Sequence, residues 1–141
     1  MRKESSPESQ LGPFQRILRG STTYFAIVFG TGFLLGPIRL LWAVPRFGER
    51  NAELMEMPIM LLVIVFAALA VKKLCDGRGS IALMIGIIAV ALMVTAELSA
   101  ALRVRGVTLS DYLQNRDPIA GSVYLAMLVV FALMPWLVAR R

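Results

Sequence analysis

Four long apolar runs, each bounded by polar or helix-breaking residues, dominate the hydrophobic pattern of this chain. A transmembrane helix needs about 20 consecutive, mostly apolar residues, and a soluble domain of this size has no use for runs of that length. The pattern therefore predicts an all-α fold, an integral membrane four-helix bundle that occupies residues 21–141. The four helices are expected at about residues 22–44, 55–74, 81–102 and 118–139.

The ends of these runs carry residues that break or cap helices. The segment PRFG, residues 45–48, is expected to end the first helix. Asp117 followed by Pro118 is a good N-cap and first-turn pair for the fourth helix, because a helix start offers free N–H groups and needs no donor from proline. Residues 1–20 are predicted as a disordered or interfacial tail, in which residues 14–19 form either a short surface helix or the first turns of the span.

The connection between the third and fourth runs predicts a further short helix. Thr108 is followed three residues later by Asp111, which is the spacing of a capping box. The helix is expected over about Leu109–Asn115, lying flat at the membrane surface. The side chains expected to turn toward the bilayer are Leu109, Tyr112 and Leu113.

The composition agrees with a membrane protein and disfavours other classes. Charged residues make up 17% of the chain, against about 25% in soluble domains. The net charge of +6 would suit nucleic acid only as a basic patch on a folded surface, whereas Lys and Arg cluster here at the ends of apolar runs. With no His and a single Cys, the chain is expected to have no metal site, no cofactor and no internal disulfide, and it is not expected to bind nucleic acid.

The distribution of Lys and Arg predicts the orientation of the four spans. The N-terminal tail, the second loop and the C-terminus share one side, which has nine basic and three acidic residues, against six and six on the other. Both termini are therefore expected in the cytoplasm. The nine basic residues of that side are Arg2, Lys3, Arg16, Arg19, Lys72, Lys73, Arg78, Arg140 and Arg141.

One arginine falls inside an apolar run and needs a partner. Arg39 lies near the outer end of the first helix, and a charge at the bilayer centre costs at least about 2.5–3.5 kcal/mol on insertion scales. It either snorkels to lipid phosphates or points into the protein on the face that it shares with Gly32 and Gly36. Glu97, at similar depth, is the first candidate partner and Glu56 the second. Such an intramembrane pair would be either a structural link or part of a proton or ion path.

A second group of charges lies between the first and second runs. Glu49, Glu53 and Glu56 are spaced i, i+4, i+7, so they share one face if the segment is helical. Such a stripe could hold a hard cation, but Arg46 and Arg50 would neutralise it. This outer loop cluster (Arg46, Glu49, Arg50 and Glu53) is therefore interpreted as a salt-bridged entry to the second helix.

Two local resemblances involve the same region. The stretch ERNAELMEMPIMLL is similar to a signature of the membrane-associated eicosanoid and glutathione metabolism family, with Arg50, Asn51, Glu53 or Glu56, and Pro58 as matching residues. That resemblance implies a membrane-embedded, glutathione-linked enzyme. The longer stretch WAVPRFGERNAELMEMPIMLL looks most like small uncharacterised bacterial four-helix inner-membrane proteins with a VPR-x-G…AEL-x-E-x-P segment. This second resemblance implies a multi-pass protein of the bacterial inner (plasma) membrane.

Three functional hypotheses follow. The leading one is a non-enzymatic structural or accessory subunit whose partners are the lipid bilayer and either further copies of itself or a larger membrane complex. The alternatives are the glutathione-linked enzyme and an oligomeric conductor of ions or small solutes. Nothing in the sequence reaches the standard of a catalytic motif, so no catalytic residue is assigned.

Overall fold

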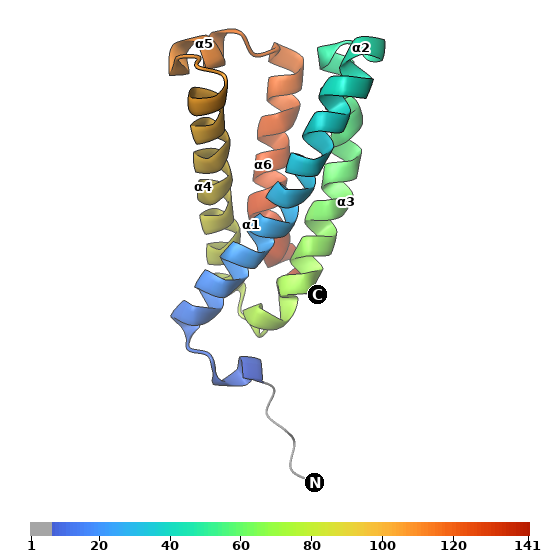
Figure 1. The fold of residues 1–141 in the computed structure, drawn as a ribbon. Helices are drawn as coiled ribbons and strands as arrows, with labels where there is room; N and C mark the ends of the chain where they lie inside the picture. The colour runs from blue at the N-terminus through green and yellow to red at the C-terminus, as the bar shows by residue number, and fades with distance from the viewer. Residues whose placement is uncertain (1–6) are drawn as a thin grey trace.

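The chain folds as a bundle of four long helices, described for residues 7–141 in a computed structural model (Figure 1). The long helices are α1 (Pro13–Ile38), α3 (Glu49–Cys75), α4 (Gly79–Val104) and α6 (Pro118–Ala139). The short elements are η1 (Pro7–Gln10), the π-helical turn η2 (Arg39–Ala43), α2 (Val44–Phe47) and α5 (Leu109–Gln114). The described part of the chain has no strand, and the predicted all-α bundle with a short helix in the third loop is confirmed. The predicted tail falls partly on residues 1–6, which lie outside the described residues.

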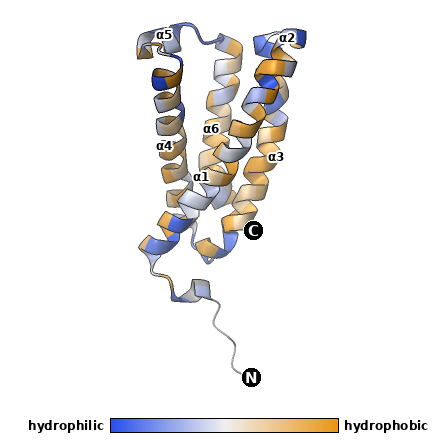
Figure 2. Ribbon diagram, in the orientation of Figure 1, coloured by the Kyte–Doolittle hydropathy of each residue, from blue (hydrophilic) through white to orange (hydrophobic). Residues whose placement is uncertain are grey.

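All four long helices are long and apolar enough to cross a membrane. The shortest has 22 residues. At 1.5 Å per residue it reaches about 33 Å, slightly more than a hydrocarbon core of about 30 Å. Large apolar side chains cover the outside of the bundle, among them Phe33 and Leu62, which are 71% and 72% exposed. Figure 2 shows mostly hydrophobic residues along the long helices and hydrophilic segments at both ends of the bundle. The chain is therefore a multi-pass membrane protein.

The helices pack in a ring in the order α1, α3, α6, α4, so that α1 and α6 face each other across the bundle, as do α3 and α4. One end of the bundle carries Gly48 and α5 and is called the α5 end (Figure 1). The opposite end carries the start of α1, the turn at residues 76–78 and the end of α6, and is called the terminus end.

The first helix is longer than its apolar run indicated. It begins at Pro13 instead of about residue 22, so residues 14–19 form its first turns. It also continues past residue 44 to Phe47, because Pro45 enters a helical turn without breaking it. The break falls on Gly48, whose φ of 82° lies in the left-handed region that glycine adopts without strain. Consequently α3 begins at Glu49 and not near residue 55.

A π-helical turn interrupts the first helix where two prolines lie close together. Pro37 and Pro45 each lack an N–H, so each removes one helical hydrogen bond to the preceding turn. Between them the helix widens at η2, where the N–H of Val44 donates to the carbonyl of Arg39, five residues back. The first span is therefore continuous from α1 through η2 to α2, and Arg39 is the first residue of η2.

The centre of the bundle toward the terminus end is filled by two aromatic rings. Tyr24 of α1 and Phe131 of α6 are 0% and 2% exposed and stack with their centroids 4.5 Å apart. The Tyr24 hydroxyl donates to the Phe131 carbonyl at 2.8 Å. That carbonyl has no helical donor four residues on, because position 135 is a proline. Tyr24 thus satisfies a backbone acceptor that hydrocarbon would leave without a partner.

Helices α4 and α6 approach each other closely at Gly86. A Cβ on Gly86 would stand 1.8 Å from the carbonyl oxygen of Ala132, so only glycine fits there. Gly32 and Gly36, which share a face with Arg39, make no such close approach. A Cβ on Gly32 would meet only the flexible end of Met60 at 3.7 Å, and one on Gly36 would meet nothing within 4 Å.

Both predicted helix starts on the third loop are confirmed. Thr108 accepts from the backbone N–H of Asp111, and the Asp111 carboxylate receives the N–H of Thr108 in return, completing a capping box on α5. The Asp117 side chain accepts from the N–H groups of residues 119 and 120, with Pro118 in the first turn of α6.

Candidate functional site

The arginine of the first span forms an ion pair with α3. Arg39 Nη1 donates to Glu56 Oε2 at 2.9 Å, and the two side chains are 27% and 14% exposed. The partner is thus the second of the two candidates. The first candidate, Glu97, belongs to α4 and has a different partner.

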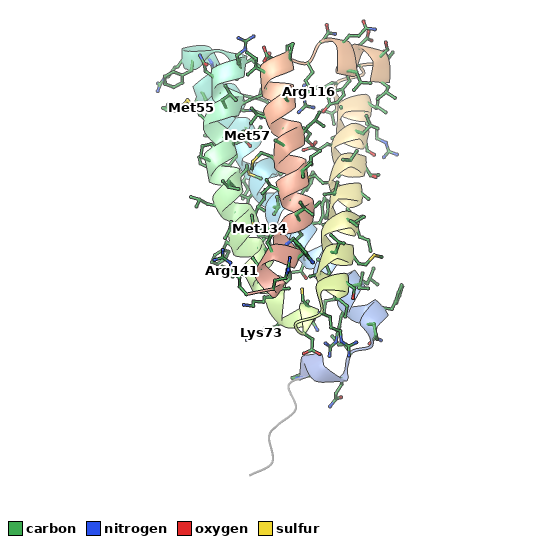
Figure 3. All side chains as sticks on the ribbon, turned by 180° about the vertical axis from the view of Figure 1, so that it is seen from behind. Met55, Met57, Lys73, Arg116, Met134 and Arg141 are labelled. Atoms are coloured by element: carbon green, nitrogen blue, oxygen red, sulfur yellow. The ribbon has the colours of Figure 1, made fainter. Side chains whose placement is uncertain are left out.

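Glu97 is bonded to a tyrosine of the neighbouring helix. The Tyr124 hydroxyl, on α6, donates to Glu97 Oε2. The guanidinium of Arg116 lies 4.2 Å from the centroid of the Tyr124 ring and donates through Nη1 to the Tyr112 hydroxyl at 2.7 Å. Figure 3 shows Arg116 at the α5 end, next to α6.

These contacts define a polar layer, which consists of Arg39, Glu56, Glu97, Tyr112, Arg116 and Tyr124. Counted from the helix ends at the α5 end, Arg39, Glu56, Glu97 and Tyr124 are six to eight residues in. At 1.5 Å per residue, each therefore lies about 9–12 Å along its helix. Each of the four membrane spans thus contributes one of these residues to the polar layer, at a similar distance from the α5 end.

The charges of the polar layer balance. Its two guanidinium groups offset its two carboxylates, so the bilayer does not have to accommodate a net charge at this depth. The Arg39–Glu56 ion pair links α1 with α3, and the Glu97–Tyr124 hydrogen bond links α4 with α6; both are pairs of neighbours in the ring. Such a set of paired groups suits a clamp between helices, and it could also hold a proton at Glu97.

One nitrogen of the polar layer has no partner. Arg116 Nε is buried, and its N–H donates to no acceptor among residues 7–141. The side chain lies against Gly121, where a Cβ would come within 3.5 Å of it. Arg116 is therefore held by the two tyrosine rings and by one hydrogen bond, without a direct salt bridge to a described carboxylate.

The four residues of the predicted outer loop cluster, all within the described part of the chain, form no salt bridge with one another. Because α3 begins at Glu49, Glu49, Glu53 and Glu56 do share one helix, but only Glu56 has an ion-pair partner in the described part of the chain. Arg46 lies over the ring of Trp42 at 4.8 Å and not against the glutamates.

Arg50 joins α3 to α6 at the surface of the α5 end. Its guanidinium donates to Asp117 Oδ2 through Nε at 2.8 Å and lies 2.7 Å from it through Nη2. This hydrogen bond is the main cause that lowers the pKa of the Asp117 carboxyl, and the backbone N–H of Ala120 adds to it. No group of three or more His, Cys, Asp or Glu side chains in the described residues could hold a metal ion.

Tyr112, Tyr124 and Arg116 were not expected in the site. Tyr112 was predicted to face the bilayer, yet its hydroxyl bonds to Arg116, while Leu109 and Leu113 are 49% and 64% exposed. The sequence did hold a signal for Tyr124, a phenol one and a half turns inside an apolar helix that would need a hydrogen-bond partner.

The four long apolar helices define the class of this chain, a small four-pass membrane protein. Comparison with protein-family models, curated proteins and solved structures gives no match for it.

Proposed function

We propose that this chain is a non-enzymatic protein of the bacterial inner membrane that acts as a structural or accessory subunit, with both termini in the cytoplasm. We place it with the small bacterial four-helix proteins on the segments 44–48 (VPRFG) and 52–58 (AELMEMP). Its partners are the bilayer and either further copies of itself or a larger membrane complex.

The observation that carries this proposal is the internal pairing of the polar layer. The Arg39–Glu56 ion pair joins the first span to α3, and the Glu97–Tyr124 hydrogen bond joins α4 to α6. The Arg50–Asp117 contact joins α3 to α6 and so connects these two pairs of helices. Groups engaged with one another inside the bundle hold its helices together, because a charge that loses its partner in hydrocarbon is costly.

The packing of the bundle gives little support to conduction through a single copy. Tyr24 and Phe131, both buried, stack between the diagonally placed α1 and α6 and fill the axis. A pore in an oligomer would have to run between copies and not through this core.

The residues that match the glutathione-linked family are engaged within the chain. Arg50 is bonded to Asp117, Asn51 to the carbonyl of Phe47, and Glu56 to Arg39. A glutathione site built on them would first have to break these contacts. The structural hypothesis therefore has the better support.

The test starts from native membranes. The full chain, extracted in mild detergent, should migrate as a species well above its own mass of 15.5 kDa, and quantitative cross-linking before extraction should give the same assembly. Purified protein in liposomes should leave proton and potassium flux at the level of empty vesicles and should not bind glutathione. A monomer in both size measurements, or flux or glutathione binding above background, would contradict the proposal.

A further inference from the structure

Basic residues gather where α3 and α6 end, at the terminus end of the bundle. Lys72 and Lys73 stand in the last turn of α3, and Arg140 and Arg141 follow α6. All four are exposed, and the two helices pack against each other. Figure 3 shows Lys73 and Arg141 at this end of the molecule. These four residues are called the basic end.

Between residues 10 and 141, the terminus end has one acidic residue, Asp76. Its carboxylate forms an ion pair with Arg16 at 3.0 Å, and it therefore does not compensate the charge of the basic end. Basic residues are favoured near any helix C-terminus by the negative end of the helix dipole. That effect acts within each helix separately, whereas here four basic residues stand at the same end of two helices that pack against each other.

Trp136 fixes the level of the basic end relative to a bilayer. The Arg140 guanidinium lies 4.4 Å from the centroid of the Trp136 ring. The indole nitrogen of Trp136 packs against Gly79 at the start of α4, and a Cβ on Gly79 would lie 3.2 Å from this nitrogen. Trp is the residue that settles at the boundary between headgroups and hydrocarbon, so Arg140 is held at headgroup level. Below it on α6, Leu133 and Leu137 are 38% and 47% exposed and offer an apolar flank to acyl chains.

We propose that the basic end binds the phosphate of an anionic phospholipid, with the acyl chains along the exposed leucines of α6. The inference goes beyond the proposed function and holds for either orientation of the chain. A Lys or Arg near an anionic membrane surface contributes about fivefold in lipid affinity, so a pair contributes on the order of 25-fold.

The experiment compares two double variants with a matched control. Lys72→Gln/Lys73→Gln and Arg140→Gln/Arg141→Gln each remove two exposed charges from the basic end. Arg103→Gln/Arg105→Gln removes two exposed charges from the C-terminal end of α4, at the α5 end. The full chain in a non-ionic detergent is titrated with phosphatidylglycerol, phosphatidylcholine or inorganic phosphate. Native mass spectrometry counts the bound lipid, and thermal unfolding gives the stabilisation.

We expect phosphatidylglycerol to bind at least tenfold more tightly than phosphatidylcholine and to raise the unfolding temperature. Either basic-end variant should lose most of that preference, while the control should retain it within about twofold. Equal affinity for the two lipids, or equal losses in the control, would overturn the proposal. Stabilisation by inorganic phosphate to the same extent would overturn it as well, because the ligand would then be a free anion.

Discussion

At the scale of single residues, the positions of the prolines determine which backbone carbonyls need a hydrogen-bond donor from a side chain. Pro135 lacks the N–H that would bond the Phe131 carbonyl, and Tyr24 supplies a hydroxyl from across the bundle. In water a solvent molecule could do this, but hydrocarbon offers none. A tyrosine within an apolar run is therefore explained by a proline more than 100 positions away, which no local pattern reveals.

This explanation predicts a coupling between Tyr24 and Pro135. Tyr24→Phe should lower the free energy of unfolding in detergent by about 1–2 kcal/mol, because the Phe131 carbonyl loses the hydroxyl that donates to it. In a Pro135→Ala background the restored N–H bonds that carbonyl, so Tyr24→Phe should cost clearly less. Equal costs of Tyr24→Phe in the two backgrounds would show that the hydroxyl serves another purpose.

The contact of Arg50 with Asp117 predicts a pH dependence at the α5 end. The folded-state pKa of Asp117 is lowered, so the contact contributes stability above the unfolded pKa and loses it as the pH falls through the lowered value. The side-chain carboxyl signal of Asp117 in NMR should titrate below 3.8, the ordinary value, and Arg50→Gln should move its midpoint upward. A midpoint that does not change in Arg50→Gln would contradict the observed contact of Arg50 with Asp117.

At the scale of elements, the number and type of helices could be predicted and their ends could not. Run length alone identified four spans, because a helix that crosses hydrocarbon has few alternatives. The ends lie in water or headgroups, where polar residues also form helices, so α1 and α3 begin well before their apolar runs. The sequence does not predict the π turn between Pro37 and Pro45, because the segment with Pro45 is expected to end the helix. The helix instead continues past Pro45, with a hydrogen bond that reaches five residues back in place of four.

Helix packing predicts which glycines are essential. Gly86→Ala should destabilise the bundle by about 2–3 kcal/mol, because its Cβ would meet the Ala132 carbonyl and force α4 and α6 apart. Gly36→Ala is the matched control, since that position opens on empty space. It should be neutral or stabilising by up to about 1 kcal/mol, as for Gly to Ala in a helix. Chemical unfolding of both variants in one detergent makes the comparison. A milder effect at Gly86 than at Gly36 would refute the packing.

At the scale of the whole molecule, the packing of the four helices decides which charges meet. Position along each helix already predicts Arg39, Glu56 and Glu97 at similar depth. The sequence could not rank the two glutamates, because α1 borders both α3 and α4 in the ring and the choice depends on how each helix is turned about its own axis. In the folded chain Arg39 meets Glu56, while Glu97 meets Tyr124.

The proposed orientation gives a prediction for the intact cell. In a Cys75→Ala background, a cysteine at position 141 should resist a membrane-impermeant maleimide added from outside, whereas Arg105→Cys at the α5 end should react. Arg105 is exposed and close to α5, so access is not limited by the fold. Permeabilised cells give the control for reactivity at both positions. Labelling of position 141 in intact cells would reverse the orientation.

The central claim, that the polar layer is a clamp of specific internal pairs, is tested most directly by double-mutant cycles on Arg39. Arg39→Leu or Glu56→Leu alone should lower the free energy of unfolding in detergent by about 2–4 kcal/mol, because each leaves a lone charge at membrane depth, and the double variant should lose less than the sum. The same cycle with Glu97→Leu is the control, with a coupling well below that of Glu56. A coupling of Arg39 to Glu56 near zero, or one no larger than its coupling to Glu97, would contradict the account.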